Sequence, residues 1–500
     1  MTQPGLTRRD LLRLGAAGAL VLAGCGGQRT AGSGTGSTLL SSWDDASGAG
    51  QLGRGPGVPL IDRHDLAPSA PLGVRLATLA HVTDAHLLDE ESPARVPFLD
   101  RLGPPFTSTF RPHEALTAQV LAGAVRSINA LRPDAVIQGG DLVDNAQSNE
   151  LKVALAALRG GRVDPNSGGP GYSGPQAASN ADPFYYRPDL DAPRQPGMLQ
   201  QAQHGFASPG LHAPWLPVLG DHDLLVQGVV PPDAEIRAIA TGSRSVWALP
   251  SRLRIPSGAS LGRAESPDGG IDPSLVRYLI AAARAAPSVR VPMDAERRQV
   301  GAGMMLARLR SASGSGGSGP LLDYTFDVGD RLRVIVLDLV RRAGGSGGLV
   351  SAGQPRWLRR QLRRAGRRWV IVTSHQPITT AEGGDALLAV LDRSPQVVAA
   401  LWGHTHRNSV VARRSPAGGY WLIGTASLID YPQQARALRL FETVGGGVAL
   451  QTWMLDHVGG GLGDISRELS YLDAQGGRPQ GFIGGHLDRN VTLYKAPPRR

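Results

Sequence analysis

Five short clusters of aspartate and histidine carry the residue types that bind metal ions. Each cluster directly follows an apolar run of strand length. The clusters are Asp84-Ala85-His86, Gly140-Asp141-Leu142-Val143-Asp144, Gly220-Asp221-His222-Asp223, Ser374-His375-Gln376-Pro377 and Gly403-His404-Thr405-His406. Imidazole and carboxylate groups together suit zinc, iron and manganese. One such cluster alone is more often a turn with a structural histidine, but five in one chain indicate a shared metal site.

Strands must position these clusters. The apolar runs predict strands at residues 74–83, 135–138, 215–219, 333–339, 369–373 and 397–402. A strand delivers its C-terminal residue to one edge of a sheet, and ligands of open α/β sheets bind at that edge. Asp84 and His86 are two residues apart, as are His404 and His406, so each pair points to one side if the segment is extended. We therefore expect five distant segments to converge on one crevice.

A crevice with two metal ions would suit the hydrolysis of phosphate esters. Phosphate oxygens repel an attacking anion. Two divalent ions about 3.5–4 Å apart neutralise this charge, lower the pKa of a bound water and hold the leaving oxygen. One carboxylate must bridge the two ions. The residue types therefore predict a hydrolase with a dinuclear metal centre.

The five clusters resemble the signature of the calcineurin-like metallophosphoesterase superfamily, over about residues 76–406. The resemblance implies an α/β fold, the four-layer α/β/β/α metallophosphoesterase sandwich. It also implies one ion on Asp84, His86, Asp141 and His406 and a second on Asp141, Asp221, His375 and His404, with Asp141 as the bridge. His222 would protonate the leaving group or stabilise the transition state, and Asp144 would orient His222.

One position departs from the family pattern, because Asp221 stands where the family usually has asparagine. A third carboxylate lowers the net charge of the dinuclear site by one. We therefore expect tighter metal binding and a less acidic nucleophilic water. The alternative is a site that has lost activity, although every other ligand is present.

The first 25 residues resemble an export signal. Arg8 and Arg9 precede a weakly apolar stretch that is too short to span a bilayer core of about 30 Å. The paired arginines resemble a twin-arginine signal, and Leu22-Ala23-Gly24-Cys25 resembles a lipoprotein cleavage box with Cys25 as the lipidated residue. We expect a lipoprotein anchored to the outer face of the cytoplasmic membrane, of an actinobacterial branch of the family. Residues 26–71, rich in glycine and serine, are predicted to form a flexible tether.

The catalytic domain is predicted over residues 72–457, with insertions at about 160–209 and 231–320 and a C-terminal extension at 458–500. Helices are predicted at residues 112–131, 149–158, 274–286, 296–309 and 354–364. Short apolar runs between glycine-rich turns predict a closing antiparallel sheet with strands at 408–412, 420–425, 438–442 and 448–455.

Composition excludes several other classes of protein. The single cysteine rules out an intrachain disulfide and a cysteine-ligated zinc site. The net charge of +10 comes almost entirely from arginine and would favour anionic partners. Long basic runs and aromatic-basic interleaving are absent from the sequence, so no nucleic acid partner is expected.

Two function classes stay open at this stage. The first is a phosphoesterase that acts on monoesters or diesters, with iron, zinc or manganese as its metal. The second is a non-catalytic, lipid-anchored binding protein for a phosphorylated ligand, which would not need the pair of His222 and Asp144. A Ser-His-Asp esterase is set aside, because no Gly-x-Ser-x-Gly elbow follows a strand. The sequence does not predict an oligomeric state.

Overall fold

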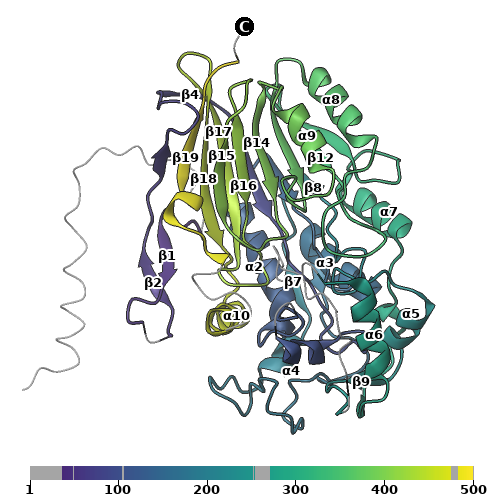
Figure 1. Ribbon diagram of the computed structural model, residues 1–500. Helices are drawn as coiled ribbons and strands as arrows, with labels where there is room; N and C mark the ends of the chain where they lie inside the picture. The colour runs from purple at the N-terminus through teal and green to yellow at the C-terminus, as the bar shows by residue number, and fades with distance from the viewer. Residues whose placement is uncertain are drawn as a thin grey trace, which may run out of the picture.

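Two β-sheets form the centre of the computed structural model, which describes residues 36–48, 50–103, 106–251, 253, 271–473 and 482–498 (Figure 1). The larger sheet has the strand order β3 (Ile61–Arg63), β19 (Val491–Lys495), β18 (Val448–Asp456), β17 (Gln434–Thr443), β4 (Leu72–Val82), β5 (Ala135–Gln138) and β8 (Trp215–Pro217). The smaller has the order β11 (Tyr324–Val328), β12 (Leu332–Leu337), β13 (Trp369–Ser374), β14 (Val397–Trp402), β16 (Tyr420–Gly424) and β15 (Ser409–Arg413).

Helices flank both sheets. The main ones are α2 (Thr117–Leu131), α3 (Ser148–Arg159), α7 (Ala302–Ser313), α8 (Gln354–Ala365), α9 (Gly384–Leu391) and α10 (Gly461–Leu472). Helix α2 contacts β17 and β18 of the seven-stranded sheet, whereas α8 contacts β12 and β13 of the six-stranded sheet. The mixed α/β fold predicted from the sequence is therefore confirmed. Among the described residues, no helix is both long and apolar enough to cross a membrane.

Strand β12 shows why the two sheets pack together. Val334 and Val336 belong to an apolar cluster that also contains residues of β17 such as Leu438. Ile335 and Leu337 point to the other side, into a second cluster with residues of α8 and α9. Because alternate residues of a strand face opposite sides, a continuously apolar run is buried on both faces.

The predicted helix at 296–309 begins later than expected, at Ala302. A short 3-10 turn, η3 (Ala295–Arg297), precedes it. The carbonyl of Arg298 accepts from Ser148 N at 3.0 Å, and Val300 N donates to Ala146 O at 2.7 Å. These bonds to the start of α3 hold the connecting backbone extended, so the helix cannot begin before them.

The predicted flexible tether at residues 26–71 is wrong for its described part. Strands β1 (Ser41–Asp44) and β2 (Gly53–Pro56) form a hairpin, and β3 pairs with β19 at the edge of the large sheet. Thr38 is fully buried, and its hydroxyl lies 3.0 Å from both Met454 O and Asn490 Oδ1. A polar, glycine-rich segment has little apolar surface to bury, but its backbone finds partners on the sheet. The predicted signal, with Cys25, lies outside the described residues.

The residues predicted as a C-terminal extension are part of the domain. Strand β19 is buried along its length and lies between β3 and β18. The fully buried guanidinium of Arg436 donates to the backbone carbonyls of Asp488 and Arg489, just before β19. The sequence boundary at residue 457 therefore cuts through a single sheet.

We expect deletion of residues 486–500 to destabilise the chain by several kcal/mol. The deletion exposes the neighbours of Val491 and Leu493, at about 1.5–3 kcal/mol for each buried apolar side chain. It also removes two of the carbonyls that accept from Arg436, and its buried Nη1 then keeps only the Thr452 hydroxyl as an acceptor. Thermal unfolding measures the effect, and deletion of residues 496–500 alone is the control, because residues 496–498 are exposed. Equal melting temperatures for the two truncations would contradict this account.

The two predicted insertions contain most of the remaining elements. Residues 160–209 include β6 (Gly161–Val163), α4 (Met198–Ala202) and β7 (Phe206–Ser208). Residues 231–320 include α5 (Ala234–Ala240), β9 (Arg244–Val246), α6 (Pro273–Ala283), β10 (Ser288–Arg290) and α7. Helices α5 and α6 share a small apolar core with η1 (Pro97–Leu102), apart from the main core.

Candidate metal centre

The seven predicted metal ligands meet at the edge where five strands end. Strands β4, β5 and β8 of the large sheet and β13 and β14 of the small sheet each lead into one of the five clusters. The ligand atoms form two groups, each with its atoms within 4.8 Å of one another: Asp84, His86 and His406 in the first, and Asp141, Asp221, His375 and His404 in the second. All seven side chains are buried.

The two groups meet at Asp141. In the first group, His406 Nε2 lies 3.3 Å from Asp84 Oδ1 and 3.2 Å from His86 Nε2. Asp141 Oδ2 lies 3.7 Å from His86 Nε2 and 2.9 Å from Nε2 of His375 in the second group. One carboxylate oxygen therefore faces both groups, which is the position of a bridging ligand.

Asp221 is the centre of the second group. Its Oδ1 lies 3.3 Å from His375 Nε2 and 3.3 Å from His404 Nδ1, and it accepts from Gln376 Nε2 at 2.9 Å. Its Oδ2 is buried and has no hydrogen-bond partner among the described residues. A buried carboxylate oxygen without a donor is costly unless a cation binds it, so this atom fits a metal ligand.

The histidines of the first group also fit a cation. His86 Nδ1 donates to Asp144 Oδ1 at 3.0 Å, and His406 Nδ1 donates to Asp430 Oδ2 at 2.5 Å. With both protons on Nδ1, the two Nε2 atoms face each other with lone pairs. A metal-binding imidazole is commonly held in this way, by a carboxylate on its other nitrogen. The arrangement stabilises a positive charge between the rings.

The pKa values of two of the histidines also favour a cation site. Burial opposes a charged imidazole, but Asp141 and Asp84 hold the pKa of His375 well above its usual range. Burial likewise opposes the charged form of His406, yet the carboxylates of Asp84 and Asp430 raise its pKa to about 10. The cluster thus has a strongly negative potential at the point where the nitrogens converge.

The ligand segments are tight turns, not the extended pairs expected from the sequence. Five ligands adopt left-handed backbone conformations: Asp84 (φ 53°), His86 (φ 40°), Asp141 (φ 46°), His404 (φ 58°) and His406 (φ 53°). Such a conformation costs a non-glycine residue about 1–2 kcal/mol. Backbone bonds to ligand carboxylates, such as His404 N to Asp84 Oδ1 at 2.9 Å, hold these turns. Strained residues of this kind gather at functional sites.

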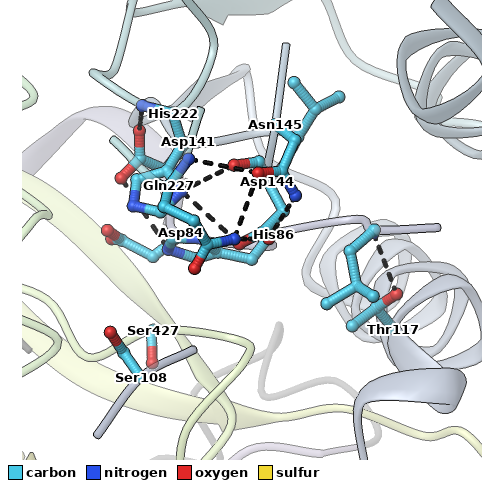
Figure 2. A network of polar contacts seen from close by, with 12 residues as sticks. Asp84, His86, Ser108, Thr117, Asp141, Asp144, Asn145, His222, Gln227 and Ser427 are labelled. Carbon is cyan, nitrogen blue, oxygen red and sulfur yellow. Dashed lines mark hydrogen bonds and ion pairs between the residues drawn. The ribbon is translucent and has the colours of Figure 1, made fainter. Parts of the chain in front are cut away.

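Asp144 was expected to orient His222 through its carboxylate, but the shorter contact comes from its backbone carbonyl. His222 Nδ1 donates to the backbone carbonyl of Asp144 at 2.8 Å and lies 3.4 Å from its Oδ1. Oδ1 of the carboxylate thus lies against both His86 and His222, and its Oδ2 accepts from Asn145 Nδ2 at 2.7 Å and Gln227 Nε2 at 2.8 Å (Figure 2). Asp144 therefore joins the predicted proton donor to the first metal group.

Gly228 explains how the chain passes over His222. Its φ of 63° is left-handed, and a Cβ there would lie 2.4 Å from Asp221 Oδ2 and 2.5 Å from His222 Nε2. Only glycine fits at that distance. The turn thus brings backbone directly against the face of the site where His222 would act.

Three contributors were not identified from the sequence. Asp430 holds His406, and Arg111 holds Asp430 through Nε at 2.6 Å. Asp223 accepts from the backbone of Leu142, Val143 and Gly220, and so ties two ligand loops together. Asp430 lies six residues after β16 and directly follows only the pair Leu428-Ile429, so it lacks the strand-length apolar run that marked the other clusters. Arg111 also lacks such a signal.

We expect Asp430→Asn to weaken metal binding in the first group about 10- to 100-fold. The asparagine still accepts a hydrogen bond but loses the charge that makes His406 a stronger ligand. Chelator competition and metal content measure the change. Asp392→Asn is the matched control, because Asp392 pairs with Arg413 as Asp430 pairs with Arg111 but contacts no ligand. Equal affinities in both variants would show that Asp430 only fills space.

Comparisons with known proteins give weak similarities. No family model matches the chain, and no curated protein matches it. A dimetal phosphatase from Danio rerio is 13% identical, with a TM-score of 0.38, over 77% of this chain and 97% of that one. A purple acid phosphatase from yellow lupin is 10% identical, with a TM-score of 0.31, over 81% of this chain and 54% of that one, about half its length. Similarity this low does not assign an activity, so the chemistry follows from the side chains above.

Proposed function

We propose that the chain is a metal-dependent phosphoesterase of the calcineurin-like metallophosphoesterase superfamily. It would hydrolyse phosphate monoesters or diesters with two divalent ions of iron, zinc or manganese. The observation that carries the proposal is the convergence of seven buried ligands in two groups that meet at Asp141 Oδ2. The carboxylates on the outer nitrogens of His86 and His406 support it, because they orient both rings toward the same point.

The protein's own residues would prepare the substrate for attack. Two ions, when bound, would neutralise the phosphate oxygens and lower the pKa of the attacking water. The bond from His222 Nδ1 to the carbonyl of Asp144 leaves Nε2 as the atom that moves a proton. From the imidazolium form, Nε2 would donate that proton to the leaving oxygen, and the carboxylate of Asp144 would stabilise the charged ring.

The membrane location is also a proposal, supported by the N-terminal sequence. Lipidated Cys25 would hold the enzyme at the outer face of the cytoplasmic membrane. Asp456 N donates to Gly36 O at 2.8 Å, so the chain is fixed to the domain from Gly36 onward. A lipid on Cys25 would therefore hold the domain close to the membrane surface.

The test uses the soluble chain that begins at residue 26. Bound metal per chain and hydrolysis of aryl phosphate mono- and diesters are measured together. About two metals with turnover would support the enzyme. Two metals without turnover on any ester would favour the alternative, a lipid-anchored binding protein for a phosphorylated ligand. A folded chain without metal would contradict both proposals.

We expect Asp221→Asn to lower metal affinity in the second group about tenfold. It should also move the acid limb of the pH–rate profile to lower pH, because one more positive charge favours loss of a proton from the nucleophilic water. Asparagine Oδ1 can still accept from Gln376, so the fold should be unaffected. Chelator competition and the pH profile check both effects. A metal affinity and a pH profile like those of the parent would mean that the third carboxylate affects neither metal binding nor the nucleophilic water.

A further inference from the structure

A cavity of about 310 Å³ lies away from the metal ligands, between the segment that leads into η1 and helices α5 and α6. This volume is in the range of small-molecule sites. Its walls are mainly apolar and include Val96, Phe98, Ile236, Ile239, Val246 and Ile280. Most of these residues belong to the small separate core or pack against it, so the walls are built independently of the metal centre.

Three arginines line the cavity, namely Arg95, Arg244 and Arg284, and no aspartate or glutamate of the described residues does. Arg95 is buried, and its terminal nitrogens are occupied by Glu114, at 2.6 and 2.9 Å, and by Thr109 O. Its Nε is buried without a hydrogen-bond partner among the described residues. Arg95 therefore forms part of the wall, and the charge that a ligand can reach lies on the other two arginines.

The other two arginines are exposed. Arg244 Nε donates to the neutral Ser288 hydroxyl at 3.0 Å, so no carboxylate of the described residues pairs with this guanidinium. Arg284 pairs with Glu235 at 2.5 Å, but both side chains are more than half exposed, and such pairs contribute little. The cavity thus combines an apolar interior with positively charged, exposed arginines.

We propose that this cavity binds an amphiphilic organic anion. The apolar body of the ligand packs against Phe98, Ile239 and Ile280. Its anionic head, a carboxylate, sulfonate or phosphate, pairs with Arg244 and Arg284. The site goes beyond the proposed phosphoesterase activity and does not depend on it, because none of the metal ligands lines the cavity.

The test is a fluorescence titration of the soluble chain with 1-anilinonaphthalene-8-sulfonate, an apolar sulfonate. We expect one saturable site, from which decanoate displaces the dye. Arg244→Glu should weaken binding at least about fivefold, because it replaces attraction by repulsion. Ile239→Trp should abolish binding by filling the cavity. Removal of metal with a chelator should leave the dye bound, which separates this result from a failure of the phosphoesterase proposal.

Arg360→Glu is the matched control. Arg360 is exposed on α8, on the other side of the small sheet's strands from the large sheet, and does not line the cavity. Its variant has the same change in net charge and should bind the dye like the parent. Absence of saturable binding, or equal weakening by Arg244→Glu and Arg360→Glu, would overturn the proposal. Thermal unfolding of each variant shows whether it folds. If Ile239→Trp does not fold, the comparison of Arg244→Glu with its control tests the proposal.

Discussion

Asp141→Asn is expected to reduce hydrolysis of aryl phosphates by about 10³-fold or more, since losing a bridging charge removes several kcal/mol of stabilisation at about 1.4 kcal/mol per tenfold. Asp141 Oδ2 faces His86 and His375 from opposite groups, so both groups lose a ligand at once. The amide keeps the shape of the side chain and one acceptor for His222 N. Turnover and metal content measured on the same preparation check the prediction.

Asp134→Asn is the control, at the other end of β5 from Asp141. Asp134 immediately precedes β5, at the end opposite the metal ligands, and accepts from Thr78 N at 2.7 Å. This variant should keep parent-like metal content and turnover. If Asp141→Asn also kept two metals and full turnover, the bridging position would be wrong. If it kept the metals and lost turnover, the charge of Asp141 would matter to chemistry and not to binding.

His222→Asn is the second change with a large expected effect, a loss of about 10²- to 10⁴-fold in kcat. His86, Asp144 and His222 also lie within ligand distance of one another, but Nδ1 of each ring is already hydrogen-bonded to Asp144, so we expect metal content to stay unchanged. The loss should be larger for alkyl phosphates than for aryl phosphates, because an aryl oxygen leaves without needing a proton. The ratio of the two rates is therefore the decisive measurement.

A purely structural role for His222 predicts a different outcome. Both ester classes would then lose activity equally, and the melting temperature would fall with them. His204→Asn is the control, because His204 is exposed and lies in an inserted segment. An unchanged ratio of alkyl to aryl rates in His222→Asn would remove the proton-donor assignment while leaving the metal centre intact.

The sequence by itself was enough to predict that the seven candidate ligands meet at one place, as they do. Each ligand follows a strongly apolar strand, and local apolar runs are visible without knowing the fold. The strands that carry the ligands were therefore predicted within a few residues, as β4, β5, β8, β13 and β14 show. The residue types then limited the chemistry to metal binding.

The tertiary structure decided what depends on contacts between distant segments. Thr38 lies in a short polar segment, and Val491 lies near the C-terminal end of the sequence. Both belong to the domain only because their segments join the edge of the large sheet. Arg111 and Asp430 lie 319 positions apart and meet only in the folded chain. The left-handed turns of the ligands arise because backbone donors bind carboxylates from other strands. Composition and periodicity report local preferences, so they cannot contain these long-range pairings.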